Sequence, residues 1–275
     1  MIVFLCDLSV LCGYIFYPEF DYSYLARNRL SKLDQSDIFE IKNMNNIATL
    51  DWDVIYQSLN DKGYAHIPNL ISKEECEQLS GLYSESNLYR SVINMQRYRF
   101  GKGEYKYFNY PLPLVIQQMR EQFYRPLSKI ANAWMKQLSI DIIYPEQHQQ
   151  LIDICKAQQQ IRPTPLILRY EAGGYNTLHQ DLYGEIYFPF QVVLALTQSG
   201  RDFTGGEFVL TEQVPRAQSK AEVLIPNQGD AIIFTTNFRS VNGTKGYYRA
   251  NMKHGISEVR SGVRYALGII FHDAS

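Results

Sequence analysis

The stretch YYRANMKHGISEVRSGVRYALGIIF, residues 247–271, contains two strand-like runs, residues 247–256 and residues 263–271. Runs of this kind, rich in β-branched and aromatic residues, are typical of β-strands. Four similar runs precede them, separated by turns that contain Gly, Asn or Asp: LILRY (166–170), EIYFPFQVVLAL (185–196), GGEFVL (205–210) and GDAIIF (229–234). Several short strands with turns between them predict an antiparallel sandwich or barrel in the C-terminal part of the chain.

The residues before Pro163 show a helical pattern instead, because their apolar side chains recur at helical spacing. The sequence predicts helices over 50–63, 114–138 and 145–159, with a break or kink at Pro126 in the second of these. A further helix is predicted to begin at a capping box formed by Ser72 and Glu75. Residues 64–68 are predicted to form a short strand. We therefore expect an α+β protein in which a helical N-terminal half packs against a C-terminal barrel or jelly roll.

A chain of 275 residues is long for one domain and short for two. We expect a single domain over residues 49–275, with helical support over 49–160 and a β core over 163–275. Residues 1–48 contain no motif and are expected to be an N-terminal extension of unknown role.

The composition gives no overall charge that favours a polyanion or a membrane, so any binding of nucleic acid would have to come from a local basic patch. The formal net charge is −1, so the whole chain exerts no electrostatic attraction on nucleic acid or on a membrane surface. Residues 1–17 are apolar, but they are short and contain Asp7, so a packed strand or helix is expected in preference to a membrane anchor. The scattered cysteines are typical of reduced thiols in a cytoplasmic protein: Cys6, Cys12, Cys76 and Cys155. We expect no stable membrane association, and the sequence does not predict the oligomeric state.

A candidate metal site begins with His179 and Asp181. In a strand, residues i and i+2 point to the same face, so the two side chains would converge on one point. His254, in another strand-like run, is the best candidate for a third ligand. Two histidines and one carboxylate form the facial triad that marks non-haem Fe(II) oxygenases. A turn in which His179 and Asp181 only share a hydrogen bond is the alternative.

Arg264 provides the context that favours the metal site. If Arg264 faces inward, Ala266 and Gly268 lie on the same face of the strand, and two small residues beside an arginine leave room for a ligand. A guanidinium group binds a carboxylate with two hydrogen bonds. No acidic residue lies near Arg264 in the sequence, so we expect it to bind a carboxylate of a cofactor.

The motifs H-x-D, GGEF, GDAIIF and HGISEVRSGVRYAL together resemble the 2-oxoglutarate/Fe(II) dioxygenase superfamily along its double-stranded β-helix, a jelly-roll or cupin-like fold. This resemblance implies that His179, Asp181 and His254 bind Fe(II) and that Arg264 binds the distal carboxylate of 2-oxoglutarate. It also implies that Tyr170 donates a hydrogen bond to this cosubstrate, and that O₂ is the oxidant. Because Asp181 is present, hydroxylation is expected in place of the halogenation that related enzymes catalyse.

A closer resemblance covers residues from about 50 to the C-terminus. The segments GEYKYFNYPLP, RPTPLILRY, LHQDLYGE, FTGGEFVLTEQVPRAQS and HGISEVRSGVRYALGIIFHDA are similar to a bacterial group of stand-alone oxygenases labelled as acting on alkylation-damaged DNA. The chain shares signatures with AlkB-type dealkylases but departs from them at two positions. Leu168 stands where those enzymes have an asparagine, and Ile270 stands where they have a second arginine. The cosubstrate pocket is therefore expected to be closer to the hydroxylase pattern.

The segment 97–110 is the candidate substrate-binding region. Its basic residues alternate with aromatic ones, a pattern that suits single-stranded nucleic acid, and Arg97, Arg99, Tyr105 and Tyr107 are the candidate contacts. The alternative is an amphipathic hairpin whose aromatic side chains pack on the barrel. The functional hypotheses are therefore oxidative demethylation of alkylated nucleic acid, hydroxylation of a protein side chain or small molecule, and metal or ligand binding without catalysis.

Overall fold

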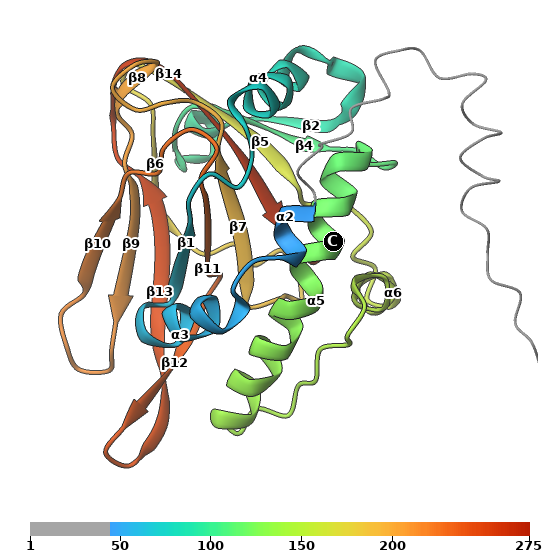
Figure 1. Cartoon of the computed structure of the whole chain (residues 1–275), viewed down its shortest axis with the longest axis vertical. Helices are drawn as coiled ribbons and strands as arrows, with labels where there is room; N and C mark the ends of the chain where they lie inside the picture. The colour runs from blue at the N-terminus through green and yellow to red at the C-terminus, as the bar shows by residue number, and fades with distance from the viewer. Residues whose placement is uncertain (1–44) are drawn as a thin grey trace, which may run out of the picture. The chain divides into compact units, whose positions relative to one another are not determined.

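The computed structural model describes residues 45–275, and these residues form two facing antiparallel sheets covered on one side by helices (Figure 1). The larger sheet has the strand order β1-β11-β7-β14-β5-β4-β2, with β8 paired to β14. The smaller sheet has the order β10-β9-β13-β6-β3, with β12 paired to β13. The predicted α+β class with a jelly-roll core is thereby confirmed. Most of the N-terminal extension predicted over residues 1–48 lies outside the described residues.

The strands of the C-terminal half form the centre of both sheets: β5 (Leu166–Glu171), β6 (Tyr175–His179), β7 (Phe190–Ala195), β8 (Phe203–Gly205), β9 (Phe208–Gln213), β10 (Lys220–Leu224), β11 (Ala231–Thr235), β12 (Phe238–Gly243), β13 (Gly246–Ile256) and β14 (Val259–Ile270). All six predicted runs contain a strand. The run 185–196 is strand only from Phe190 onward, since Pro189 lacks the backbone N–H that a central strand needs.

The N-terminal half also contributes strands, which the helical pattern did not predict apart from β1 (Tyr64–Ile67). These are β2 (Tyr89–Asn94), β3 (Gly101–Lys102) and β4 (Glu104–Phe108). β4 pairs with β5, β1 pairs with β11, and β3 pairs with β6 of the smaller sheet. These strands extend the edges of a sheet whose other strands come from far along the chain, so local periodicity alone does not reveal them.

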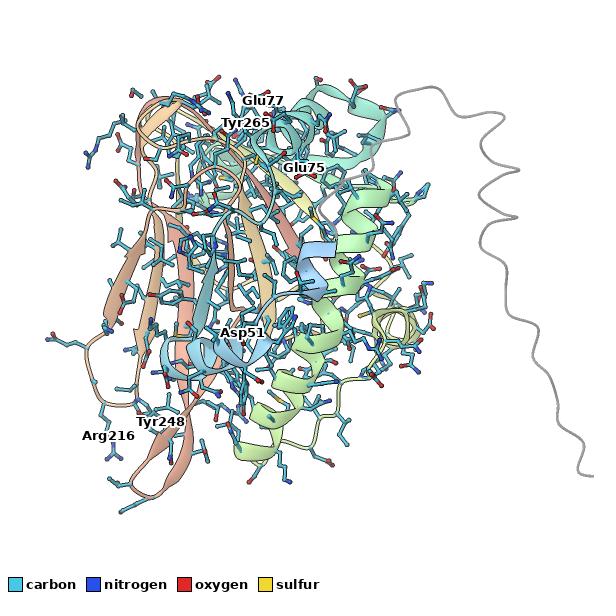
Figure 2. All side chains as sticks on the ribbon, viewed as in Figure 1. Asp51, Glu75, Glu77, Arg216, Tyr248 and Tyr265 are labelled. Atoms are coloured by element: carbon cyan, nitrogen blue, oxygen red, sulfur yellow. The ribbon has the colours of Figure 1, made fainter. Side chains whose placement is uncertain are left out.

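The helices are α2 (Asn45–Ala48), α3 (Trp52–Lys62), α4 (Lys73–Gly81), α5 (Leu114–Gln137) and α6 (His148–Ala157), with short 3₁₀ turns η2 (Leu82–Ser84), η3 (Ser86–Leu88) and η4 (Met95–Tyr98). The Asp51 carboxylate, labelled in Figure 2, caps α3 by accepting a hydrogen bond from the N–H of Val54, and Gly63 ends the helix with a left-handed φ of 77°. The predicted capping box of Ser72 and Glu75 is present at the start of α4. α5 continues through Pro126 as one helix.

α5 runs along the outer side of the larger sheet, and α6 lies on the far side of α5 (Figure 1). The apolar side chains of α5 are buried, and the ring of Trp134 in this helix lies 4.7 Å from the ring of Phe190 in β7. This packing covers the outer face of the sheet, and a cavity lies between the inner faces of the two sheets. Among residues 45–275, no helix combines the length and the apolar character needed to cross a bilayer.

Candidate metal centre and cosubstrate pocket

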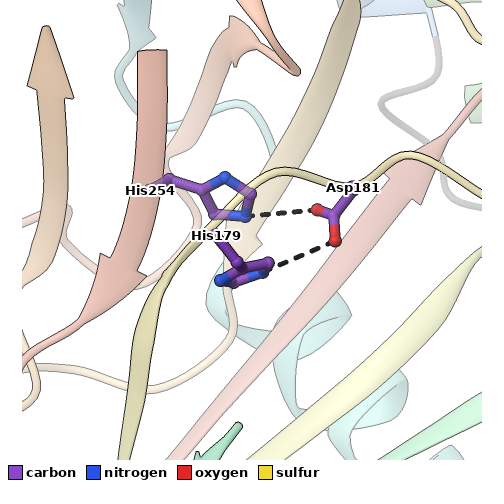
Figure 3. A group of neighbouring side chains, drawn as sticks. All are labelled: His179, Asp181 and His254. Carbon is purple, nitrogen blue, oxygen red and sulfur yellow. Dashed lines mark ion pairs between the residues drawn. The ribbon is translucent and has the colours of Figure 1, made fainter. Parts of the chain in front are cut away.

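The three predicted metal ligands lie together between the two sheets. His179 ends β6 and is the direct cross-strand partner of His254 in β13, so the two imidazole rings lie 4.2 Å apart. The Nε2 atoms of His179 and His254 lie 3.4 and 3.2 Å from the Asp181 carboxylate (Figure 3). The sequence pattern predicts that strand alternation brings His179 and Asp181 together. This prediction is wrong, because β6 ends at His179 and Asp181 lies two residues beyond its end.

Neighbouring groups orient two of these three side chains. The Nδ1 atom of His179 lies 2.7 Å from the carbonyl oxygen of Thr177, so it donates there and leaves Nε2 as the nitrogen that faces Asp181 and could bind a metal ion. The Tyr183 hydroxyl donates to Oδ1 of Asp181 at 2.7 Å. His254 has no such partner at Nδ1, and its ring is held by aromatic packing, lying 4.8 Å from the ring of Phe234.

The electrostatics of the three groups suit a divalent cation. Burial alone would raise the pKa of Asp181, but His254 and His179 hold the pKa of that carboxyl well below its usual range. Burial, together with the charge of His179, lowers the pKa of His254 and so favours its neutral form. Burial alone would lower the pKa of His179, but the hydrogen bond with Asp181 and the charge of that carboxylate raise it, so a bound cation would take the place of the proton on this imidazole. One carboxylate and two imidazole nitrogens form a ligand set that suits Fe(II). The three side chains supply ligand atoms that all lie within 4.8 Å of one another.

Arg264 lies in the same pocket and carries a buried positive charge that no acidic side chain among residues 45–275 compensates. Its residue is 4% exposed, and burial lowers the pKa of its guanidinium. No carboxylate within residues 45–275 pairs with it; the groups facing it are the rings of Tyr170 and Phe203, at 5.8 and 6.0 Å. A buried charge without a partner is costly in free energy, so the pocket requires an anion at this point.

Tyr170 and Gly206 shape the surroundings of Arg264. Tyr170 in β5 is the cross-strand partner of Arg264, and its fully buried hydroxyl faces the Asn176 side chain but donates no hydrogen bond in the described part of the chain. Gly206 has a left-handed φ of 63°, and a Cβ atom there would lie 3.0 Å from Cδ of Arg264. The glycine thus leaves the room that the arginine side chain occupies. A carboxylate that accepts hydrogen bonds from Arg264 and Tyr170 would satisfy both groups, so the residues present fit 2-oxoglutarate.

A cavity of about 210 Å³ connects Arg264 with the three candidate ligands. The predicted small residues Ala266 and Gly268 line it, as expected for strand positions on the same face as Arg264. Further lining residues, which the sequence pattern did not indicate, come from neighbouring strands and from the loop after β6: Tyr183, Gln191, Phe208 and Phe234. These four follow ordinary strand or loop patterns, and only the pairing of distant strands places them in the pocket.

The segment 97–110 divides between the pocket and the surface. Tyr105 and Phe100 line the cavity. Tyr107 is 8% exposed, and its ring packs edge-on against Tyr183, so it lies behind the cavity wall. Arg97 and Arg99 are exposed and do not line the cavity. Part of the segment therefore lines the pocket and part of it packs into the sheet.

Comparisons with known proteins agree with this geometry. A sequence model of the family Oxygenase-NA, described as "Oxygenase, catalysing oxidative methylation of damaged DNA", matches residues 103–274. An uncharacterized protein of Mycobacterium tuberculosis, MT2286 in strain CDC 1551 and Rv2227 in strain H37Rv, is 43% identical over 168 residues, which are 61% of this chain and 72% of the relative.

Among solved structures, an oxidoreductase of the 2OG-Fe(II) oxygenase family from Burkholderia pseudomallei is similar in fold, with a TM-score of 0.51 and 16% sequence identity. The alignment covers 82% of this chain and 94% of that chain. The chain therefore belongs to the Oxygenase-NA family of oxygenases and has the fold of the 2OG-Fe(II) oxygenases, the class whose cofactors are Fe(II), 2-oxoglutarate and O₂.

Proposed function

We propose that this protein is a dioxygenase in which His179, Asp181 and His254 hold Fe(II), and Arg264 and Tyr170 hold 2-oxoglutarate. The observation that carries the proposal is Arg264, a buried guanidinium without an acidic partner, in the same cavity as a two-histidine, one-carboxylate cluster. A structural arginine would have its own acceptor, whereas a cosubstrate carboxylate supplies one at this position.

The chain's own residues would contribute binding, orientation and exclusion of water. When bound, the iron and the 2-oxo acid together activate O₂ for insertion of one oxygen atom into a C–H bond of the substrate. The hydrogen bonds from His179 to Thr177 and from Tyr183 to Asp181 keep the ligand side chains in fixed orientations. Phe208 and Phe234 pack around His254 and exclude water from that side of the site.

We propose an alkylated base of single-stranded nucleic acid as the substrate. The description of the family supports this class. The rim of the pocket also supports it: the rings of Tyr98 and Phe100 stack 5.5 Å apart at an angle of 17°, and both residues are about half exposed. Phe100 lines the cavity, so a base next to the target could stack on this pair. Arg97 and Arg99 are exposed beside the two rings, with no acidic partner among residues 45–275, and could neutralise phosphates.

The test of the reaction is 2-oxoglutarate turnover with methylated single-stranded oligonucleotides, measured as succinate and formaldehyde in equal amounts. Asp181→Ala and Arg264→Leu should abolish both products, while Tyr247→Ala, which removes an exposed aromatic ring outside the pocket, should not change them. Tyr98→Ala should weaken oligonucleotide binding more than the same Tyr247→Ala control.

The remaining hypotheses predict different products in the same assay. Succinate formed with peptides or small molecules but not with any methylated oligonucleotide would contradict the nucleic-acid substrate and favour a side-chain or metabolite hydroxylase. Absence of succinate with every substrate, together with the absence of a visible charge-transfer band when Fe(II) and 2-oxoglutarate are added without oxygen, would favour a non-catalytic binding protein.

A further inference from the structure

Gln191 is a buried side chain in the pocket whose amide nitrogen has no acceptor. It lies in β7, is 4% exposed and lines the same cavity as Arg264 and the three candidate metal ligands. Its Nε2 atom has no hydrogen-bond partner within residues 45–275. A buried N–H without an acceptor costs free energy, because its lost hydration is not replaced. The cavity therefore favours a ligand that brings a hydrogen-bond acceptor to this point.

Gln160 shows how this chain pairs a glutamine that holds the fold together. Gln160 is 1% exposed, and its Nε2 atom donates to the carbonyl oxygens of Ile186 and Asp273 at 2.8 and 2.6 Å. Its Oε1 atom accepts from the backbone N–H of Ile186 at 2.7 Å. The nitrogen of Gln191 makes no such contact, so it is available to a ligand.

The cosubstrate that Arg264 holds does not reach Gln191. The pairing of β7 with β14 makes Gln191 the cross-strand partner of Ile270, which lies six residues after Arg264, or roughly 20 Å along the strand. 2-Oxoglutarate spans only about 6 Å between its carboxylates, since they are joined by a short carbon chain. A cosubstrate bound at Arg264 therefore leaves the other end of the cavity free for a second ligand.

The candidate metal ligands lie next to this free end. Gln191 is also the cross-strand partner of Phe234 in β11, whose ring lies 4.8 Å from the ring of His254. On the other side of Gln191, its neighbour in β14 packs against Tyr183, and the Tyr183 hydroxyl donates to Asp181. A ligand at Gln191 is thus separated from two of the three metal ligands by one side chain each. The substrate is the ligand that must lie beside the metal, opposite the cosubstrate.

We propose that Gln191 is a specificity-determining residue for the substrate, donating a hydrogen bond from its amide to a carbonyl oxygen next to the methylated nitrogen of the base. The bases 3-methylcytosine and 3-methylthymine have such a carbonyl group. In 1-methyladenine the group beside the methylated nitrogen is an amino donor, so Nε2 of Gln191 would stay unpaired. A site that hydrogen-bonds its substrate discriminates against an analogue that lacks the partner atom. Hydrogen bonds to this edge are also how other enzymes read a base taken out of the stack.

This inference rests on the proposed function, and binding tests it. The full chain is loaded with 2-oxoglutarate and Mn(II), which does not turn over. Fluorescence anisotropy then measures its affinity for single-stranded oligonucleotides that differ only in one methylated base. Wild type should bind the 3-methylcytosine and 3-methylthymine oligonucleotides about 10-fold more tightly than the 1-methyladenine oligonucleotide. Gln191→Met keeps the length of the side chain but removes the N–H, so it should abolish this preference by weakening the two tighter complexes.

Two further variants separate this role from cosubstrate binding and from folding. Gln191→Met should keep the wild-type affinity for 2-oxoglutarate in calorimetry, whereas Arg264→Leu should weaken it. Gln160→Leu should lower the melting temperature, because three hydrogen bonds are lost, and keep the preference among the oligonucleotides. Gln191→Met loses no hydrogen bond from Nε2, so its melting temperature should not fall.

The outcomes distinguish failure of this inference from failure of the proposed function. Equal wild-type affinities for the three oligonucleotides, or an unchanged preference in Gln191→Met, would overturn the role of Gln191 and leave the dioxygenase standing. Absence of binding to every methylated oligonucleotide would overturn this role together with the nucleic-acid substrate. Absence of 2-oxoglutarate binding in the wild-type protein would overturn the proposed function itself.

Discussion

The two faces of the larger sheet differ in how completely their buried polar groups are paired. On the outer face, the fully buried Arg120 of α5 donates to the Asp273 carboxylate at 2.7 Å and to the carbonyl oxygen of Ile270 at 2.8 Å. On the inner face, Arg264 is also buried, at 4% exposed, but has no acceptor among residues 45–275, and the groups that face it are the rings of Tyr170 and Phe203. The fold thus provides hydrogen-bond acceptors for Arg120 but none for Arg264. We infer that a ligand supplies the acceptor for Arg264.

The same contrast applies to the two glutamines, since Gln160 on the packed side has three hydrogen bonds and Gln191 in the pocket has no partner for its nitrogen. Pairing inside the protein thus distinguishes residues that hold the fold from residues that await a ligand. The distinction makes opposite predictions for similar substitutions on the two faces.

Removal of Arg120 should have the largest effect. Arg120→Leu leaves the Asp273 carboxylate buried without its cation, so the free energy of unfolding should fall by about 3–5 kcal/mol. Urea denaturation followed by far-UV circular dichroism measures this change. An unfolding free energy within about 1 kcal/mol of wild type would contradict the view that the outer face depends on this pair.

Removal of Arg264 should act on binding and not on folding. Arg264→Leu takes away a buried charge that has no partner, so the unfolding free energy should stay constant or rise. The affinity of the Mn(II)-loaded protein for 2-oxoglutarate should fall about 100-fold, which corresponds to about 2.7 kcal/mol. A loss of stability comparable to that of Arg120→Leu would show that Arg264 has a structural partner and would remove the basis of the proposed cosubstrate site.

Acid should weaken the packed face through His148. Burial lowers the pKa of His148 from 6.5 to about 3, with a further contribution from the charge of Arg120. Between these two pH values the unfolded chain binds a proton that the folded chain does not. Stability due to neutral His148 is therefore complete above about pH 6.5 and falls as the pH drops, by up to about 1.4 kcal/mol per pH unit.

The measurement for His148 is the unfolding free energy at pH 7 and at pH 5. Because one titrating group is removed, His148→Gln should lose less stability than wild type over this interval, by about 2 kcal/mol. His272, whose burial also lowers its pKa to about 3, remains in both proteins as a background. Equal losses in the two proteins would exclude His148 as a source of acid sensitivity.

The sequence predicted much of the centre of the molecule because the informative signals there are local. His179 and Asp181 are two residues apart, and the parity of one strand correctly placed Ala266 and Gly268 on the face of Arg264. The assumed strand geometry at Asp181 was wrong, yet the side chains still converge, because the chain leaves β6 directly after His179.

The rest depends on which distant strands become neighbours. Gln191 enters the pocket because β7 pairs with β14, and β4 joins the larger sheet because it pairs with β5. The residues within and next to these strands do not indicate which strand each one pairs with. Unpaired donors such as the Gln191 amide can be recognised only when every surrounding acceptor has been placed, which a sequence pattern does not do.

The last prediction concerns Tyr183, whose hydroxyl group forms a hydrogen bond with one carboxylate oxygen of Asp181 in the pocket. It donates to Oδ1 of Asp181 at 2.7 Å, so Oδ2 is the oxygen left for a metal ion. Tyr183→Phe should weaken Mn(II) binding about 10-fold, because the carboxylate loses its fixed orientation, and should change stability little.

Tyr124→Phe is the matched control, since it removes a hydrogen bond from a phenol to the carbonyl oxygen of Pro145 on the packed side. It should lower the unfolding free energy by about 1 kcal/mol and leave Mn(II) binding unchanged. Equal Mn(II) affinities in Tyr183→Phe and wild type would mean that pairing on the inner face does not orient the metal ligand, and the contrast between the faces would then apply to Arg264 and Gln191 alone.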